Sequence, residues 1–300
     1  MGVSKILVVI DPKRDNRILL ERSRRLAIIY DASVELYIAA YSSAIEGSHW
    51  FDKEGLNSAH AGYIHAKQAW LANLVESLEA EGVKATGYVE WAKPLHRAVL
   101  ERADCTDTSL ILKQADHHSV MVKALFTNTD WHLIRESKTP LLFVHENEWG
   151  SHLSVAAAVD PLHIHSKPED LDDKLLQSAH DLACKLPAEL HVVHVYEPIP
   201  TGAIAEFDAV IADYEFYREK VRSRHRESLD ELLKRNVEST TIVHFEEGIP
   251  ERVLPHVVNE SGIDIIVMGA VSRSGLDKIF IGSTAERVLD NLMCDILILK

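Results

Sequence analysis

Short apolar runs alternate with longer amphipathic stretches along the chain. In residues 1–147, each apolar run of strand length is followed by a stretch whose apolar positions recur every three or four residues, as on one face of a helix. The runs that predict strands are KILVVID, VELYIAA, KATGYVEW, SLILK and PLLFV. Helices are expected at about 14–30 and 59–81, directly after Pro94, and through Trp131. This alternation predicts a parallel sheet built from βαβ units.

The same order of elements returns in residues 152–300. The predicted strands are LSVAAAVD, ELHVVHV, STTIVHF, DIIVMG and DILIL. Helices are expected at about 171–186, within 204–235, after Pro250 and at about 285–292. Both halves therefore read as five strands joined by four helices, which predicts two α/β domains, each with a five-stranded parallel sheet flanked by helices.

Landmark residues of the two halves can be superimposed at a nearly constant offset. The matched pairs are Asp11 with Asp160, 149 residues apart, and Pro94 with Pro250 and Lys113 with Gly269, each 156 residues apart. Because order and spacing both hold, we interpret the chain as an internal duplication. Domain boundaries of 1–147 and 152–300 follow, with the short segment ENEWGSH between the last strand of one copy and the first strand of the next.

Composition and charge narrow the function classes. The chain of 300 residues is 46% hydrophobic and 26% charged, which is ordinary for a globular protein. Its net charge is −14, divided as −3 in residues 1–150 and −11 in residues 151–300, and this balance argues against a nucleic-acid partner. No apolar run approaches the roughly 18 residues of a membrane helix, so no membrane partner is expected. Three scattered cysteines form no CxxC pair, and we expect a cytoplasmic protein.

A glycine-bearing loop in the second copy has the chemistry of an anion site. Gly269 ends a predicted strand, and Gly282, Ser283 and Thr284 stand at the start of the next helix. The first N–H groups of a helix are unpaired and carry the positive end of its dipole, and the two hydroxyls add donors. Because glycine has no Cβ, an anion can approach the backbone at Gly282. In the acidic second half, such local donors would have to hold the anion.

At these residues the chain resembles the universal stress protein family, and it is most similar to the tandem, E-type members. ATP-binding members carry a motif of one glycine, two residues, a second glycine, nine residues, and a third glycine followed by serine or threonine. Here Gly269 and Gly282-Ser283 match this motif, and Ser272 stands in place of the second glycine. The resemblance implies two Rossmann-like domains of the adenine nucleotide alpha hydrolase type, with ATP, alone or with Mg²⁺, as the ligand of the second copy. The nucleotide-binding residues that it implies are Asp160, Val195, Met268, Gly269, Ser272, Arg273, Gly282, Ser283 and Thr284.

The first copy departs from this motif at several positions. Lys113 and Asp116 replace the first two glycines, and Thr127-Asn128 stands where Gly282-Ser283 stands in the second copy. An extra carboxylate repels a triphosphate, and side chains in place of glycines crowd it. We therefore expect the first copy not to bind ATP in the way of the family, although Asp11 persists and another ligand can take its pocket.

Simpler explanations exist for several of these residues. Ser283 can cap its own helix, and Asp11 and Asp160 can serve as turn or capping residues. Among the seventeen histidines, His191 and His194 fall on opposite faces of a strand and cannot chelate together. The remaining histidine pairs lack the context of a strong zinc motif, so no metal site and no catalytic residue is predicted.

Three functions remain open at this point. The first is a stress-response protein that senses or sequesters a nucleotide in its second copy. The alternative is a non-nucleotide scaffold, or a carrier of an apolar ligand or a partner protein, and the third is slow ATP hydrolysis by the second copy. In relatives the last strand pairs across a two-fold axis, so PLLFV and DILIL would pair within one chain and make an intramolecular pseudo-dimer. Association of two such chains into a further homodimer stays open.

Overall fold

A computed structural model describes residues 2–47, 52–115, 126–162, 170–198, 214–237, 240–269, 272–274, 278–280 and 283–300. These residues divide into two compact units, the first running from Gly2 to Glu148 and the second from Trp149 to Lys300. The two units correspond to the two copies expected from the sequence.

The first unit is a parallel sheet with strands in the order β3-β2-β1-β4-β5. Its elements are β1 (Lys5–Val9), α1 (Arg17–Tyr30), β2 (Ser33–Ala40), α2 (Ser43–Glu46), α3 (Lys53–Ala80), β3 (Ala85–Trp91), α4 (Leu95–Cys105), β4 (Leu110–Gln114), α5 (Asn128–Glu136) and β5 (Leu141–Val144). The chain winds outward from β1 to β3, crosses back to β4 and continues to β5.

The second unit repeats this order as β8-β7-β6-β9-β12, again parallel. Its elements are β6 (Leu153–Ala158), α6 (Leu171–Lys185), β7 (Ala188–Tyr196), α8 (Tyr214–Asn236), β8 (Ile242–Glu247), α9 (Pro250–Glu260), β9 (Ile265–Gly269), β10 (Ser272–Ser274), β11 (Lys278–Phe280), α10 (Ser283–Leu289) and β12 (Asp295–Leu299). A small antiparallel pair, β10 and β11, stands between β9 and α10.

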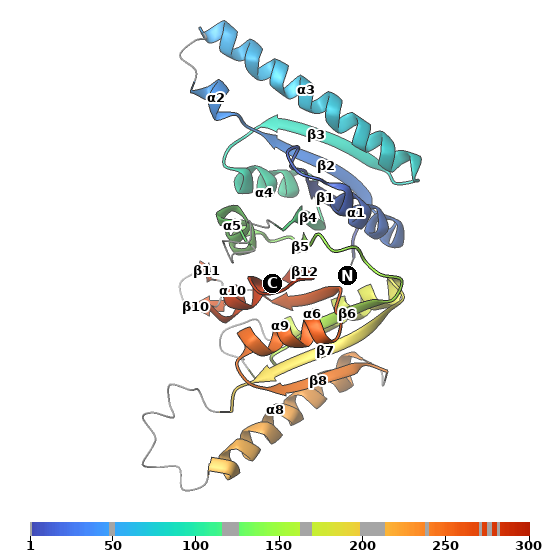
Figure 1. Cartoon of the computed structure of the whole chain (residues 1–300), viewed down its shortest axis with the longest axis vertical. Helices are drawn as coiled ribbons and strands as arrows, with labels where there is room; N and C mark the ends of the chain where they lie inside the picture. The colour runs from blue at the N-terminus through green and yellow to red at the C-terminus, as the bar shows by residue number, and fades with distance from the viewer. Residues whose placement is uncertain are drawn as a thin grey trace. The chain divides into compact units, whose positions relative to one another are not determined.

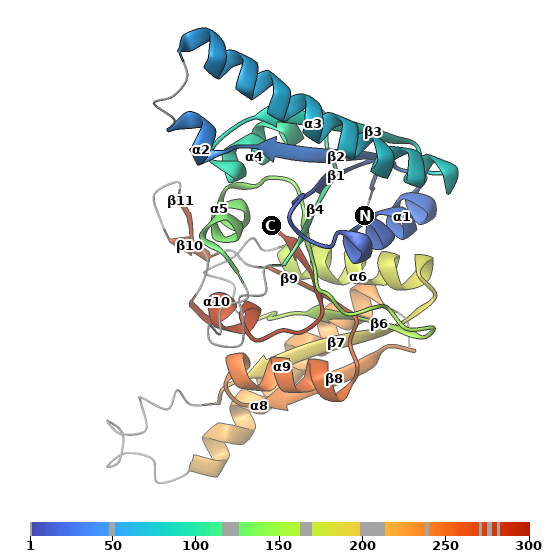
Figure 2. The same cartoon turned by 45° about the horizontal axis from the view of Figure 1, so that its top comes forward.

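The winding direction decides which face each helix covers. Right-handed crossovers place α1 and α3 on one face of the first sheet and α4 and α5 on the other, because the chain reverses direction after β3. In the same way α6 and α8 share one face of the second sheet, and α9 and α10 share the other. Figure 1 shows α3 along β3 and β2, and α8 along β8 and β7; the turned view in Figure 2 keeps both arrangements.

The central strands form the core because both of their faces are covered. Ile6, Leu7 and Val8 of β1 are fully buried, and in the second unit β6 carries Val155 and Ala156 with no exposed surface. Continuous apolar strands of this kind belong to parallel sheets with helices on both sides. The polar ends of these strands therefore mark the positions where the chain turns toward solvent.

Helix starts differ most from the sequence prediction. The predicted start of α1 at residue 14 is wrong, because Asn16 Nδ2 donates to the carbonyl oxygens of Asp11 and Arg14, each at 2.9 Å, and holds this segment as a turn until Arg17. The start of α3 lies six residues earlier than the predicted residue 59, since Asp52 caps the helix by accepting a hydrogen bond from the Gly55 N–H at 2.8 Å. The pair β10 and β11 and the short helix α2 were not predicted.

Candidate functional site

The second unit has a reversal point at the carboxyl ends of its central strands. The chain leaves β6 toward β7 on one side and returns to β9 on the other. Ala157 of β6 pairs with Val267 of β9, and Ala158 pairs with Val193 of β7, so the three strands end at one edge. In open α/β sheets, ligands bind outside this edge, at the point where the strand order reverses.

Four of the nine predicted nucleotide-binding residues lie at this edge. Asp160 is the second residue after β6, Val195 is the next-to-last residue of β7, and Met268 and Gly269 close β9. The side chain of Met268 is buried, whereas Asp160, Val195 and Gly269 are partly exposed. The backbone N–H of Asp160 donates to the Asp172 carboxylate at 3.1 Å, which ties the strand end to the first turn of α6.

The other five predicted residues belong to the loop and helix that follow β9. Gly282 lies outside the described residues. Ser272 and Arg273 are placed in β10, Ser283 and Thr284 open α10, and Thr284 is exposed. Contact of these five residues with a phosphate stays a prediction.

Gly269 has a packing reason to be glycine. A Cβ built on its backbone would lie 2.7 Å from Leu171 Cδ2, closer than real Cβ contacts allow. Leu171 is the first residue of α6 and is almost fully buried. The glycine therefore lets the start of α6 close over the end of β9, a role that is independent of any ligand.

The first unit has a cavity at the corresponding reversal point, between β1 and β4. Its volume is about 310 Å³, and it opens beyond the carboxyl ends of β1, β2 and β4. Its wall combines four basic residues with one acidic residue, namely Lys13, Arg14, Lys67 and Lys113 with Asp11, and includes the aromatic rings of Tyr41 and Tyr63. The cavity therefore has a cationic wall beside an aromatic one.

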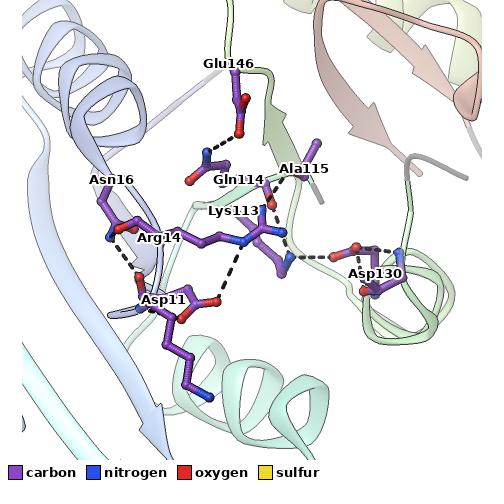
Figure 3. Close-up of polar contacts among 10 residues, drawn as sticks. Asp11, Arg14, Asn16, Lys113, Gln114, Ala115, Asp130 and Glu146 are labelled. Carbon is purple, nitrogen blue, oxygen red and sulfur yellow. Dashed lines mark hydrogen bonds and ion pairs between the residues drawn. The ribbon is translucent and has the colours of Figure 1, made fainter. Parts of the chain in front are cut away.

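Lys113 and Asp130 form a buried ion pair at this cavity (Figure 3). Lys113 Nζ lies 2.9 Å from Asp130 Oδ1, and the two side chains are 10% and 0% exposed. The second oxygen of Asp130 accepts from Thr127 N at 2.8 Å and from Thr127 Oγ1 at 2.7 Å, which completes a capping box at the start of α5. The helix start that corresponds to Gly282-Ser283 is thus occupied by the protein's own carboxylate. From the sequence, Lys113 was identified only as the replacement of a glycine, because its partner Asp130 carries no motif.

Beside this pair, the loop after β1 is linked to the residue that follows β4 (Figure 3). Arg14 Nη1 donates to the Ala115 carbonyl at 3.3 Å, and its Nε lies 3.8 Å from the Asp11 carboxylate. Asp11 also accepts from the Lys13 N–H at 2.9 Å, so it acts as a turn residue and not as the cap of α1. These contacts within the chain hold the loop that lines the cavity.

A second hollow of about 460 Å³ lies between α1 and α3 of the first unit. Leu20 from α1 and Trp70, Leu74 and Leu78 from α3 give it an apolar floor. Its rim is charged and includes the ion pair between Arg24 Nε and Glu81 at 3.0 Å. An apolar floor with a charged rim suits an amphipathic ligand better than a nucleotide.

The three cysteines form no disulfide bond. Cys105 and Cys184 are exposed, and Cys294 is buried. Among the described residues, every helix is either too short or too polar to cross a bilayer.

Comparison with known proteins identifies relatives of the whole chain. The sequence profile of the universal stress protein family matches residues 2–145 and again residues 162–300. Universal stress protein E of Escherichia coli (strain K12) is 27% identical, over 98% of this chain and 93% of its own length. The protein of the same name from Photorhabdus laumondii subsp. laumondii is 28% identical, over 98% of this chain and 94% of its own length.

Solved structures share the fold along the entire chain. A functionally unknown protein from Pseudomonas aeruginosa PAO1 has a TM-score of 0.75 and 24% identity, covering 100% of this chain and 93% of that one. A universal stress protein from Archaeoglobus fulgidus has a TM-score of 0.69 and 18% identity, covering 100% of this chain and 99% of its own. The predicted duplication and the predicted α/β class are both confirmed.

Proposed function

Because the chain belongs to the universal stress protein family and carries its domain twice, we propose that it acts in the stress response by binding ATP or a related nucleotide in the second unit. One observation carries this proposal: Asp160 and Gly269 flank the reversal point between β6 and β9, where parallel α/β sheets bind ligands. The unpaired cysteines agree with a reducing, cytoplasmic location, which is part of the proposal.

The proposed nucleotide extends from the strand ends to the start of α10. Asp160 faces the ribose and base, and Val195 and Met268 cover the adenine. The phosphates, with Mg²⁺ where it is bound, face the segment from Gly269 to Thr284. Support for the phosphate position comes from chemistry: unpaired N–H groups, the hydroxyls of Ser283 and Thr284, and the guanidinium of Arg273 are donors suited to an anion.

Calorimetric titration of MgATP into the intact chain tests this site. Gly282→Asp places a carboxylate at the proposed phosphate position and should abolish the binding heat, because like charges repel. Asn128→Asp is the matched control, since Asn128 is the exposed first residue of the corresponding helix of the first unit, where a carboxylate suits the helix dipole and leaves the contact between Thr127 and Asp130 in place. Equal heats from wild type and Gly282→Asp would rule out the proposed site.

The hollow between α1 and α3 favours a second function, a carrier of an apolar ligand or a docking site for a partner protein. Its floor of Leu20, Trp70, Leu74 and Leu78 is the specific observation behind this alternative. Native mass spectrometry of the freshly purified chain separates the two functions, because a retained nucleotide supports the first and a lipid-like mass supports the second. Trp70→Glu should remove a lipid-like mass and leave a nucleotide in place.

A further inference from the structure

Two histidines and an aspartate of the second unit converge from three separate elements. Asp160 follows β6, His194 lies in β7 and His225 lies in α8. One potential ligand atom from each residue lies within 4.8 Å of the others. The group lies on the face of the sheet that α8 covers, at the carboxyl end of β6.

His194 is held in one orientation by the backbone. Its ring has no exposed surface, and its Nδ1 lies 2.9 Å from the carbonyl oxygen of Val159. A carbonyl oxygen only accepts, so His194 donates from Nδ1 and the neutral ring keeps its lone pair on Nε2. Metal-binding histidines characteristically make this hydrogen bond with the nitrogen that does not bind the ion.

The lone pair of His194 is directed at His225. His194 Nε2 lies 2.8 Å from His225 Nδ1, and the ring centroids are 5.0 Å apart. The distance between the ring centroids is close to the sum of the nitrogen–nitrogen distance and the two distances from a ring centroid to its nitrogen. The two nitrogens therefore point at each other, nearly in the planes of their rings. Because His194 Nε2 accepts, His225 Nδ1–H donates the hydrogen bond between them. Lone pairs of imidazole lie in the ring plane, so loss of that proton and a tilt of the two rings would direct both lone pairs at one ion.

We propose that Asp160, His194 and His225 bind one divalent transition-metal ion, with Zn²⁺ as the best fit. Imidazole nitrogen and carboxylate oxygen are ligands that Zn²⁺ prefers, and three protein ligands leave the fourth position of a tetrahedral site open to water or to a bound ligand. A Zn²⁺ ion with bonds of about 2.0–2.1 Å holds its ligand atoms about 3.3 Å apart, so small side-chain movements convert the observed cluster into a site. Binding displaces the proton from His225 Nδ1, which moves to solvent or to Nε2 of the same ring.

The surroundings of His225 support a protected site. The ring of Tyr196 lies 5.0 Å from His225 and 4.8 Å from Phe245, measured between centroids. These rings form an apolar shell on one side of the cluster, and such a shell limits access of water to a bound ion.

A second cluster of similar composition has the wrong geometry. In the first unit, the rings of His96 and His132 stack face to face, with centroids 4.2 Å apart and planes 10° apart, beside the carboxylate of Glu136. Lone pairs of parallel stacked rings run side by side and do not converge on one ion. The pair of His191 and His244 has nitrogens 2.9 Å apart but is not part of a three-ligand group among the described residues.

Titration of ZnCl₂ into chelator-treated protein, without nucleotide, tests the proposal. Wild type should bind one Zn²⁺ per chain, and His225→Gln should weaken binding by more than about 100-fold, since even outer partners of zinc ligands contribute 10–100-fold. His225 is partly exposed on a helix surface, so this variant is expected to fold. The matched controls His244→Gln and His132→Gln each remove one histidine from the competing clusters and should bind like wild type.

Co²⁺ substitution gives a second readout that a loosely held ion would not produce. The wild-type complex should show the intense visible absorption of four-coordinate Co²⁺, and His225→Gln should not. Unchanged Zn²⁺ affinity in His225→Gln, or a loss in His132→Gln alone, would overturn the proposal. Gly282→Asp should retain the metal, so failure of the nucleotide proposal and failure of the metal proposal can be told apart.

Discussion

Lys113 shows how a single substitution changes the chemistry of a repeated fold. At the position where the second unit has Gly269, the first unit carries a lysine whose ammonium is paired with the buried Asp130 carboxylate. The pair supplies both charges from within the protein at the start of α5. The substitution thus adds an internal ion pair to the first unit, and this pair could not be inferred from the lysine alone because its partner is 17 residues away in the sequence.

Breaking this pair should be costly. Lys113→Met leaves the Asp130 carboxylate buried without its counter-charge, and we expect a loss of about 3–5 kcal/mol in the free energy of unfolding. The exposed pair of Lys174 and Asp170, 2.7 Å apart, is the control, and Lys174→Met should cost less than about 0.5 kcal/mol. Urea unfolding followed by circular dichroism measures both. Equal losses in the two variants would contradict the assignment, and Lys113→Met/Asp130→Asn should recover part of the loss.

Glu35 makes the first unit sensitive to acid. The side chain is almost fully buried; burial raises its pKa, but the hydrogen bond from Arg102 and the ion pair with Lys5 at 2.7 Å outweigh burial and hold the pKa below 4.5. Because the folded pKa is lowered, the stabilisation is complete above pH 4.5 and is lost as the pH falls through the lowered value.

Glu35→Gln should therefore cost about 2 kcal/mol at pH 7 and flatten the decline in stability below pH 4.5. Thermal unfolding at a series of pH values between neutral and acid checks both effects. Glu81→Gln, at a half-exposed partner of Arg24, is the control and should follow the wild-type curve. A Glu35→Gln curve parallel to wild type throughout would disprove this account.

At the scale of elements, periodicity predicted the five parallel strands described in each unit and the longer helices between them, but not the short helix α2. Apolar runs bounded by turns identify buried parallel strands well. Pro94 and Pro250 also mark the starts of α4 and α9 as expected. Helix starts were predicted less well, because they depend on side-chain hydrogen bonds such as those of Asn16 and Asp52. The pair β10 and β11, three residues per strand, is too short to leave a periodic signal.

The contact between β9 and α6 gives a prediction at this scale. Gly269→Ala should destabilise the second unit by about 1–3 kcal/mol, because its Cβ would overlap Leu171 Cδ2. Leu171→Ala alone should cost about 2–5 kcal/mol through the cavity that it leaves, and Gly269→Ala/Leu171→Ala should cost less than the sum of the two single variants, since the overlap is gone. Gly62→Ala, in the exposed interior of α3 with open space around it, should instead stabilise by about 0.5–1 kcal/mol. Chemical denaturation compares wild type with these four variants, and additive effects at positions 269 and 171 would refute the packing role.

At the scale of the whole molecule, the repeat was readable from the sequence because duplicated landmarks keep their spacing. The candidate sites were readable only in part. Asp160 and Gly269 lie at the expected edge of the sheet. The proximity of Asp160 to His194 and His225 depends on how α8 packs over β7. His194 and His225 are 31 residues apart, one on a strand and one on a helix, and no sequence motif links them. Pairing of the two units through β5 and β12 stays a prediction.

The asymmetry between the units predicts one nucleotide per chain. In the first unit the start of α5 is capped by Thr127 and Asp130, and Lys113 is already paired, so the groups that would meet a phosphate are satisfied before any ligand arrives. A triphosphate that binds there would have to displace the buried carboxylate of Asp130. The free-energy cost of that displacement is larger than the attraction between the triphosphate and the lysines of the cavity. Equilibrium dialysis with labelled ATP should therefore saturate at one equivalent, and Asn128→Asp, at the exposed start of α5, should leave that value unchanged. Two equivalents in wild type would show that the first unit binds nucleotide as well. One equivalent that survives Gly282→Asp would place the nucleotide in the first unit and reverse the roles assigned to the two copies.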